Sequence, residues 1–131
     1  MKFKSIIIIL FLSIYCYSEQ FQHIDINKYK KQYSYINDYK QQGRIIFLIR
    51  ANHYYEFKIN LKKGQYLFIL KGEDGFKHSI IEPSGYEYEI IKSNFLDNEV
   101  IRFENIMEKG IYKIKIYSDV DNTIEMIYGI Y

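Results

Sequence analysis

The chain changes its hydrophobic pattern near residue 43. From residue 44 onward, apolar and polar side chains mostly alternate, and turn-forming sequences recur between the alternating segments. The segments start about eleven residues apart, the interval expected of strands in an antiparallel β-sandwich or barrel. We therefore predict eight strands, at 44–50, 54–61, 65–71, 76–82, 86–92, 99–106, 111–118 and 123–130.

The predicted strands differ in how many of their faces are apolar. In 54–61 and 111–118, apolar residues alternate with polar ones, so we expect one buried and one wet face on each strand. Residues 66–70 are apolar throughout, which predicts a central strand covered on both sides. Gly64 and Gly110 each follow a lysine, and we expect both to supply the positive φ of a hairpin turn.

Residues 19–42 have a different pattern. Ile26, Tyr29, Tyr33 and Ile36 are spaced as one stripe of a helix, and Asp25 precedes them as a candidate N-cap. We predict a short amphipathic helix here. Two interpretations of its apolar stripe are open. The stripe either packs on the following domain or binds a partner or a membrane surface.

Residues 1–18 are arranged like an export signal. Lys2 and Lys4 precede an apolar run at 6–14, and small residues lie near Ser18. The run is shorter than the roughly 20 residues that span a bilayer, so we expect no transmembrane helix in the mature chain. The predicted organisation is a signal peptide (1–18), a polar segment (19–42) and a β-sandwich (43–131), in a secreted or periplasmic protein.

The single cysteine leaves two interpretations open. Cys16 either belongs to an ordinary signal or is the acylated first residue of an envelope lipoprotein, although Tyr15 is bulkier than the residue that usually precedes a lipidated cysteine. In both cases the chain has no internal disulfide, and thiol chemistry and cysteine-ligated zinc are excluded.

The charge balance argues against a nucleic-acid partner. The chain has 18 basic and 16 acidic residues, and removal of Lys2 and Lys4 with the signal leaves 16 of each. Nucleic-acid binding depends on a positive field, and no later segment is dense enough in lysine and arginine to restore one.

Several short motifs resemble a known family. They are Tyr55-x-Phe57, Lys63-Gly64-x-Tyr66, Glu82-Pro83-Ser84-Gly85 and Lys109-Gly110-x-Tyr112-x-Ile114-x-Ile116. Together they resemble the bacterial pre-peptidase C-terminal domain over about residues 53–131. The resemblance implies a small jelly-roll-like β-sandwich of a secreted bacterial protein, a non-catalytic accessory module.

Catalytic motifs are absent from the sequence, so we expect no enzyme. Ser84 lacks the glycine that starts a nucleophile elbow, and a Pro-Ser-Gly turn explains it better. His23, His53 and His78 are scattered, and Glu87 and Glu89 lie too close in sequence to act across a cleft. A small hydrolase using His78 or Glu89 is the least supported of the function classes.

We expect no cofactor. Two acidic turns, Glu73-Asp74 and residues 119–122, offer oxygens to calcium, but neither forms a complete binding loop. Turn capping is the simpler role for these side chains.

Tyrosines supply the candidate binding residues, because a phenol combines a flat apolar face with a polar edge. Tyr54, Tyr86 and Tyr88 are the candidates. We predict a non-enzymatic exported binding or accessory module of the bacterial cell envelope that contacts a protein or glycan. The alternatives are a small secreted inhibitor of an enzyme, inserting a loop tip such as residues 73–76, or an envelope lipoprotein anchored through Cys16.

Overall fold

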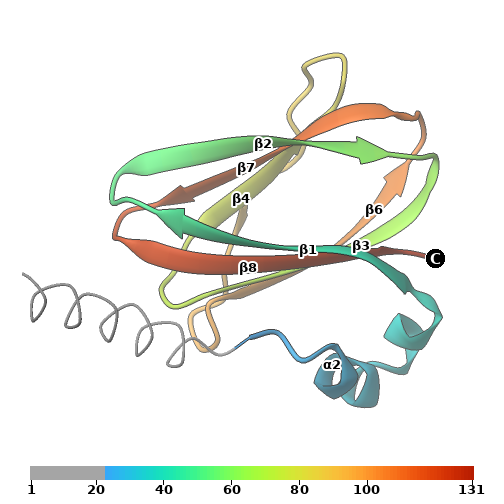
Figure 1. Cartoon of the computed structure of the whole chain (residues 1–131), viewed down its shortest axis with the longest axis horizontal. Helices are drawn as coiled ribbons and strands as arrows, with labels where there is room; N and C mark the ends of the chain where they lie inside the picture. The colour runs from blue at the N-terminus through green and yellow to red at the C-terminus, as the bar shows by residue number, and fades with distance from the viewer. Residues whose placement is uncertain (1–22) are drawn as a thin grey trace, which may run out of the picture.

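Eight antiparallel strands form two four-stranded sheets that pack face to face as a β-sandwich (Figure 1). The structure is a computed structural model that describes residues 23–131, so the predicted signal peptide and Cys16 lie outside the described residues. One sheet has the order β1-β8-β3-β6, and the other has the order β2-β7-β4-β5. The predicted antiparallel, all-β fold class is confirmed. The strands are β1 (Lys40–Ile49), β2 (His53–Leu61), β3 (Gly64–Gly72), β4 (Lys77–Ile81), β5 (Ile91–Lys92), β6 (Glu99–Ile106), β7 (Gly110–Ser118) and β8 (Asn122–Ile130).

The main core lies between the sheets and follows the predicted alternation. On β7, Tyr112, Ile114 and Ile116 are buried, whereas Lys113 between them is exposed. The same alternation holds at the end of β2, where Ile59 and Leu61 are buried around an exposed Asn60. Both strands therefore have one wet face, as predicted.

Strand β3 is buried on both faces, which confirms the prediction for residues 66–70. Tyr66, Phe68 and Leu70 face the main core, and Leu67 and Ile69 belong to a second cluster on the other side of the sheet. The second cluster contains residues of the N-terminal segment, so the double burial of β3 depends on that segment.

The N-terminal segment packs on the β1-β8-β3-β6 sheet. Helix α2 (Ile26–Gln32) is capped by Asp25, whose carboxylate accepts the Asn27 N–H at 3.0 Å. Tyr33 then adopts an extended conformation, and the stripe continues through a short 3₁₀ helix, η1 (Ser34–Asp38). The predicted stripe and cap are confirmed, but the single helix is wrong because the chain breaks at Tyr33.

Two predicted strand boundaries need correction. Strand β1 begins at Lys40 rather than 44, because polar residues at this sheet edge still pair with Ile130, Gly129 and Tyr128 of β8.

The predicted strand 86–92 is interrupted. Ile81 lies opposite Glu87 and His78 lies opposite Ile91, so the later segment carries one extra residue, as in a bulge, and only β5 remains regular.

The two predicted hairpin glycines have different roles. Gly64 has φ +155°, outside the range favoured by other residues, in agreement with the prediction. Gly110 has no positive φ, so its predicted role is wrong. A Cβ at Gly110 would instead lie 2.7 Å from Pro83 Cγ, and glycine is needed there for close approach.

Candidate binding surfaces

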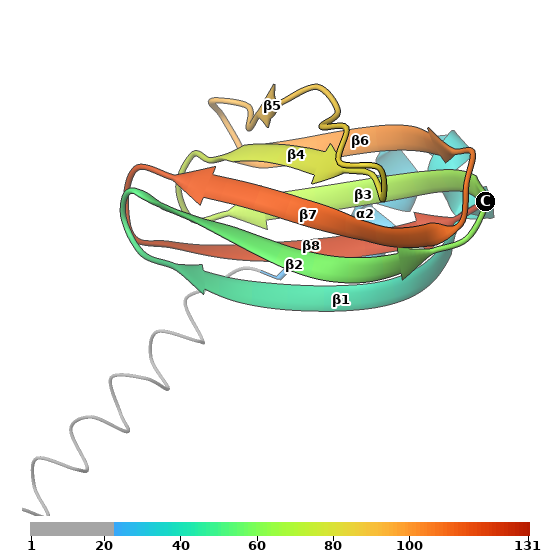
Figure 2. The same cartoon turned by 90° about the horizontal axis from the view of Figure 1, so that it is seen from above.

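The outer faces of the two sheets differ in what covers them. We call β1-β8-β3-β6 the covered sheet, because the segment of α2 and η1 lies over its β3 and β8 strands, where Leu67, Ile69 and Ile127 are buried (Figure 1). We call β2-β7-β4-β5 the open sheet, because β2 and β7 have no helix in front of them (Figure 2). On the covered sheet, Ile46 and Leu48 of β1 remain exposed beside the segment, whereas the β2 and β7 strands of the open sheet have an outer face without a helix over it.

The strand register arranges the outward side chains of the open sheet in rows. The first row runs across all four strands through Tyr54, Tyr117, Lys77 and Lys92. The next rows contain Glu56, Lys115 and Ser79, and then Lys58, Lys113 and Ile81. Neighbouring strands are about 4.8 Å apart, so the first row spans about 14 Å.

The same face is hollowed on both sides of this first row. One hollow of about 270 Å³ is lined by residues that include Tyr54, Lys115 and Ile90. A second hollow of about 300 Å³ reaches the loops and includes Lys92 and Asp119. Lys77 and Tyr117 line both hollows, so these two side chains lie between them.

Local contacts fix the two tyrosine rings of the row. Tyr54 is 60% exposed, and the Lys115 ammonium lies 4.9 Å from the centre of its ring, a cation–π distance. A hydrogen bond to Asp119, with a smaller effect of burial, raises the pKa of Tyr117. Each phenol therefore has a charged neighbour, with Tyr54 exposed and Tyr117 half-buried.

Tyr86 and Tyr88, the other predicted contact residues, lie together but away from Tyr54. Their ring centres are 5.9 Å apart. Tyr86 is 65% exposed, whereas Tyr88 packs against the main core and donates its hydroxyl to Glu82 at 3.3 Å. Burial, followed by the nearby Tyr112 and Glu82, raises the pKa of Tyr88 to about 12. The structure thus does not join the three predicted tyrosines into one surface.

Two buried polar residues lie behind the open sheet. Arg102 donates to Glu104 at 2.7 Å and to the Glu89 carbonyl at 2.9 Å, and this second bond holds the bulged segment beside β4. His78 is 1% exposed, and among residues 23–131 neither ring nitrogen makes a hydrogen bond of good geometry. Burial, reinforced by the Arg102 charge, lowers the pKa of His78 to about 3. His78 lines the first hollow but only 1% of the residue is exposed, so the geometry does not favour it as a proton-transfer group.

Side chains of the turn at residues 119–122 cap backbone groups of neighbouring loops. Asp121 accepts the Ala51 N–H at 2.8 Å. Asn122 accepts the Asp74 N–H at 3.1 Å and donates to the Asp74 carbonyl at 2.9 Å. Within residues 23–131, no group of three histidine, cysteine or carboxylate side chains could hold a metal ion. The predicted turn-capping role is therefore supported for Asp121 and Asn122, whereas no such contact of the Asp74 carboxylate is seen within residues 23–131.

An exposed apolar loop tip was missed in the sequence. Phe95 is 96% exposed and Leu96 is 87% exposed. Asn94 holds the loop by accepting the N–H groups of Asp97 and Glu99 at 2.9 and 3.3 Å. In contrast, Phe76, at the tip that we expected to insert, is buried in the core. The available signal was a pair of large apolar residues between turn-forming asparagines.

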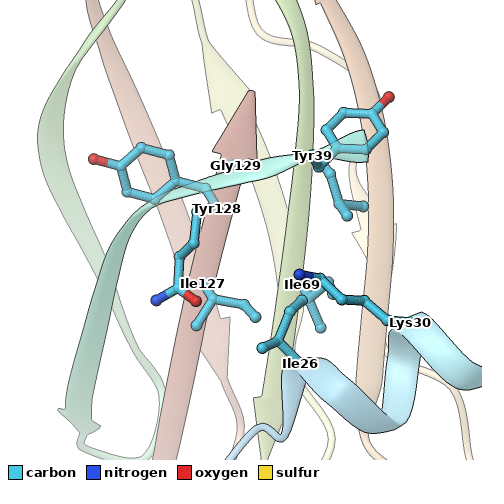
Figure 3. A pocket seen from close by; sticks show the side chains of 9 residues that line it. Ile26, Lys30, Tyr39, Ile69, Ile127, Tyr128 and Gly129 are labelled. Atoms are coloured by element: carbon cyan, nitrogen blue, oxygen red, sulfur yellow. The ribbon is translucent and has the colours of Figure 1, made fainter. Parts of the chain in front are cut away.

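A small crevice separates α2 from the covered sheet (Figure 3). Its lining includes Ile26, Ile69, Ile127 and the stem of Lys30. The crevice volume is about 50 Å³, against about 270 and 300 Å³ for the two hollows of the open face. This crevice is the smallest of the three spaces, and we do not take it as the candidate site.

No helix within residues 23–131 is long and apolar enough to cross a membrane. A comparison with models of known protein families and with curated proteins finds no match to this chain. The resemblance to pre-peptidase C-terminal domains therefore stays a prediction, and the function is argued from the surfaces above.

Proposed function

We propose that this protein is an exported, non-enzymatic binding module of the bacterial cell envelope that contacts a protein or glycan through the outer face of its open sheet. One observation carries the proposal. The chain covers one sheet with its own N-terminal segment and leaves the other with a hollowed face of fixed tyrosines and exposed lysines. Export is inferred from the sequence of residues 1–18.

The fold suits this role. We infer a jelly-roll-like sandwich, because eight strands distributed as β1-β8-β3-β6 and β2-β7-β4-β5 form two interlocked Greek keys. A rigid sandwich keeps the rows of the open face at fixed spacing, so a ligand meets a preformed surface and less binding free energy is lost to ordering.

Cosedimentation of the purified full-length protein with envelopes of the producing bacterium tests the proposal. Tyr54→Ser/Tyr117→Ser should weaken binding by about tenfold, since each phenol presents a large, rigid contact surface. Tyr35→Ser/Tyr131→Ser is the matched control, because Tyr35 and Tyr131 are comparably exposed, at 53% and 68%, and lie outside the open face. Absence of wild-type binding, or equal loss in both double variants, would contradict the proposal.

The exposed Phe95–Leu96 tip favours a second candidate function. Two adjacent large apolar side chains on a hydrogen-bonded loop could enter an apolar pocket of an enzyme, as an inhibitor requires. A tight one-to-one complex that Leu96→Asp abolishes and Tyr54→Ser leaves intact would establish this function in place of the first.

The envelope location has its own test. Mass spectrometry of the protein recovered from its own cells distinguishes a soluble chain that starts at Glu19 from a detergent-extracted chain with lipid on Cys16. The first result supports a free exported module. The second makes the protein an anchored lipoprotein with residues 19–42 beginning close to the membrane.

A further inference from the structure

We propose that the ligand of the open face is an acidic polysaccharide, with carboxylates held by lysines and sugar rings resting on Tyr54 and Tyr117. The inference rests on the proposed function and specifies its ligand class. It is argued from the charge, register and shape of this one face.

Lysines face each other directly at two places on this face. Lys77 lies opposite Lys92, and Lys58 lies opposite Lys113. Like charges at directly opposed positions destabilise an antiparallel pair. Neither pair is therefore explained by the stability of the sheet, whereas a bound anion would turn both into favourable contacts.

The rows of the open face carry more lysines than acids. Lys115 lies between the two pairs, and none of the five lysines makes an ion pair with a described residue. The outward acids on these rows are Glu56, which lies directly opposite Lys115, and Glu87, which accepts a hydrogen bond from Ser79 at 2.9 Å. Asp74 and Asp119 line the second hollow. The rows thus carry five lysines and two glutamates, although the chain after residue 18 has equal numbers of basic and acidic residues.

The first row combines two kinds of contact along one line. Tyr54 and Tyr117 offer flat rings, and Lys77 and Lys92 follow on the next two strands. A sugar ring has an apolar C–H face and a polar rim, which matches a phenol, while a uronic acid adds a carboxylate for an ammonium. A chain of acidic sugars can make both contacts at once as it crosses the strands.

Composition and shape favour a glycan over other polyanions. Protein interfaces are enriched in arginine and depleted in lysine, and all the basic residues on these rows are lysines. A lipid bilayer is a flat surface, whereas Lys77 and Tyr117 line hollows of about 270 and 300 Å³ that a single chain can enter.

Isothermal titration of the full-length protein with polygalacturonate tests this inference. The fully methyl-esterified polymer is the matched ligand, because it has the same sugar chain without the charge. We expect polygalacturonate to bind at least about tenfold more tightly, and its affinity to fall as salt is raised from about 50 to 200 mM.

Lys77→Gln/Lys92→Gln should weaken polygalacturonate binding by at least about tenfold, because it removes one directly opposed lysine pair. Lys62→Gln/Lys63→Gln is the control, since these exposed lysines lie at the β2–β3 turn, away from the rows. All four positions are exposed or at the surface, and an unchanged Tm for each double variant confirms that it is folded.

The possible failures are distinguishable. Equal affinity for the acidic and esterified polymers, with envelope binding that still depends on Tyr54 and Tyr117, overturns the acidic ligand and keeps the proposed function. Tighter binding of polyglutamate or of vesicles rich in anionic lipid overturns the glycan class. Absence of both envelope and polymer binding overturns both proposals.

Discussion

The outer faces of the covered and open sheets show how one fold uses similar surfaces differently. On the covered sheet, the outward Leu67, Ile69 and Ile127 are apolar and buried under the N-terminal segment. On the open sheet, the corresponding outward positions hold Lys113, Lys115 and Tyr117. The covered face adds apolar burial to the stability of the domain, and the open face keeps charge repulsion that a ligand could relieve.

Buried polar groups follow the same division. On the covered sheet, Glu125 is fully buried, but its carboxylate contacts His23 at 2.6 Å, the Ile24 N–H at 3.0 Å and Arg44 at 3.2 Å. The residues that surround this buried carboxylate therefore also supply its hydrogen-bond and ion-pair partners. Behind the open sheet, His78 is buried, and neither ring nitrogen makes a hydrogen bond of good geometry with any residue of 23–131.

The largest predicted effects are on β3, where both faces are covered. Phe68→Ala should destabilise the domain by about 3–5 kcal/mol, and Ile69→Ala by about 2–5 kcal/mol, because each leaves a cavity. Lys115→Ala on the open sheet should change stability by no more than about 0.5 kcal/mol. Urea denaturation measures all three. A small loss for Ile69→Ala would show that the N-terminal segment does not cover the sheet tightly.

The next effect depends on pH and on His78. Burial lowers its pKa to about 3 in the folded protein, whereas an unfolded histidine titrates near 6.5. Between these values the unfolded chain binds the extra proton, so stability falls as the pH falls, by about 1.4 kcal/mol per unit. This contribution is fully present above about pH 6.5.

His78→Leu should remove that part of the acid sensitivity, since leucine does not titrate. Between pH 6.5 and pH 4.5 the wild type should lose about 2–3 kcal/mol more than the variant, measured by urea denaturation at each pH. His53→Leu is the control, because His53 is exposed. Equal losses in the wild type and His78→Leu would place the acid sensitivity elsewhere.

A smaller predicted effect concerns the contacts that attach the N-terminal segment to the covered sheet. Arg44 contacts the Glu125 carboxylate and donates to the Ile24 carbonyl at 2.7 Å. Arg44→Met should cost about 1–3 kcal/mol, because it leaves a buried carboxylate with fewer donors. Amide exchange should then quicken in residues 26–38. Arg50→Met, at an exposed position outside these contacts, should leave exchange there unchanged.

Local patterns predicted most of this fold. Alternation and turn residues located the strands, because burial of one sheet face imposes a period of two. The errors arose where distant residues decide the structure. The bulge before β5 is held by Arg102 on β6, and the early start of β1 depends on pairing with β8.

The candidate site was less predictable than the fold. Alternation along β2 was enough to identify Tyr54 as outward. Its neighbours in the row come from three other strands and are Tyr117, Lys77 and Lys92. Their alignment depends on the register between strands, which cannot be read from the local sequence of any one strand. Tyr88 is half-buried because its ring packs on the core, and alternation alone did not indicate this.

The smallest predicted effect is a gain in stability on the open face. Lys92→Glu places a carboxylate opposite Lys77, so a repulsive cross-strand pair becomes an attractive one. Stability should rise by about 0.2–1 kcal/mol in urea denaturation at low salt, and the gain should shrink at high salt. The same substitution should weaken polygalacturonate binding, because it reverses a charge in the first row. Lys63→Glu is the control, since Lys63 lies in the turn between β2 and β3 and has no lysine across a strand pair. If Lys92→Glu lowers stability, or if it raises stability and leaves polymer binding unchanged, then the opposed lysines are not kept for an anionic ligand.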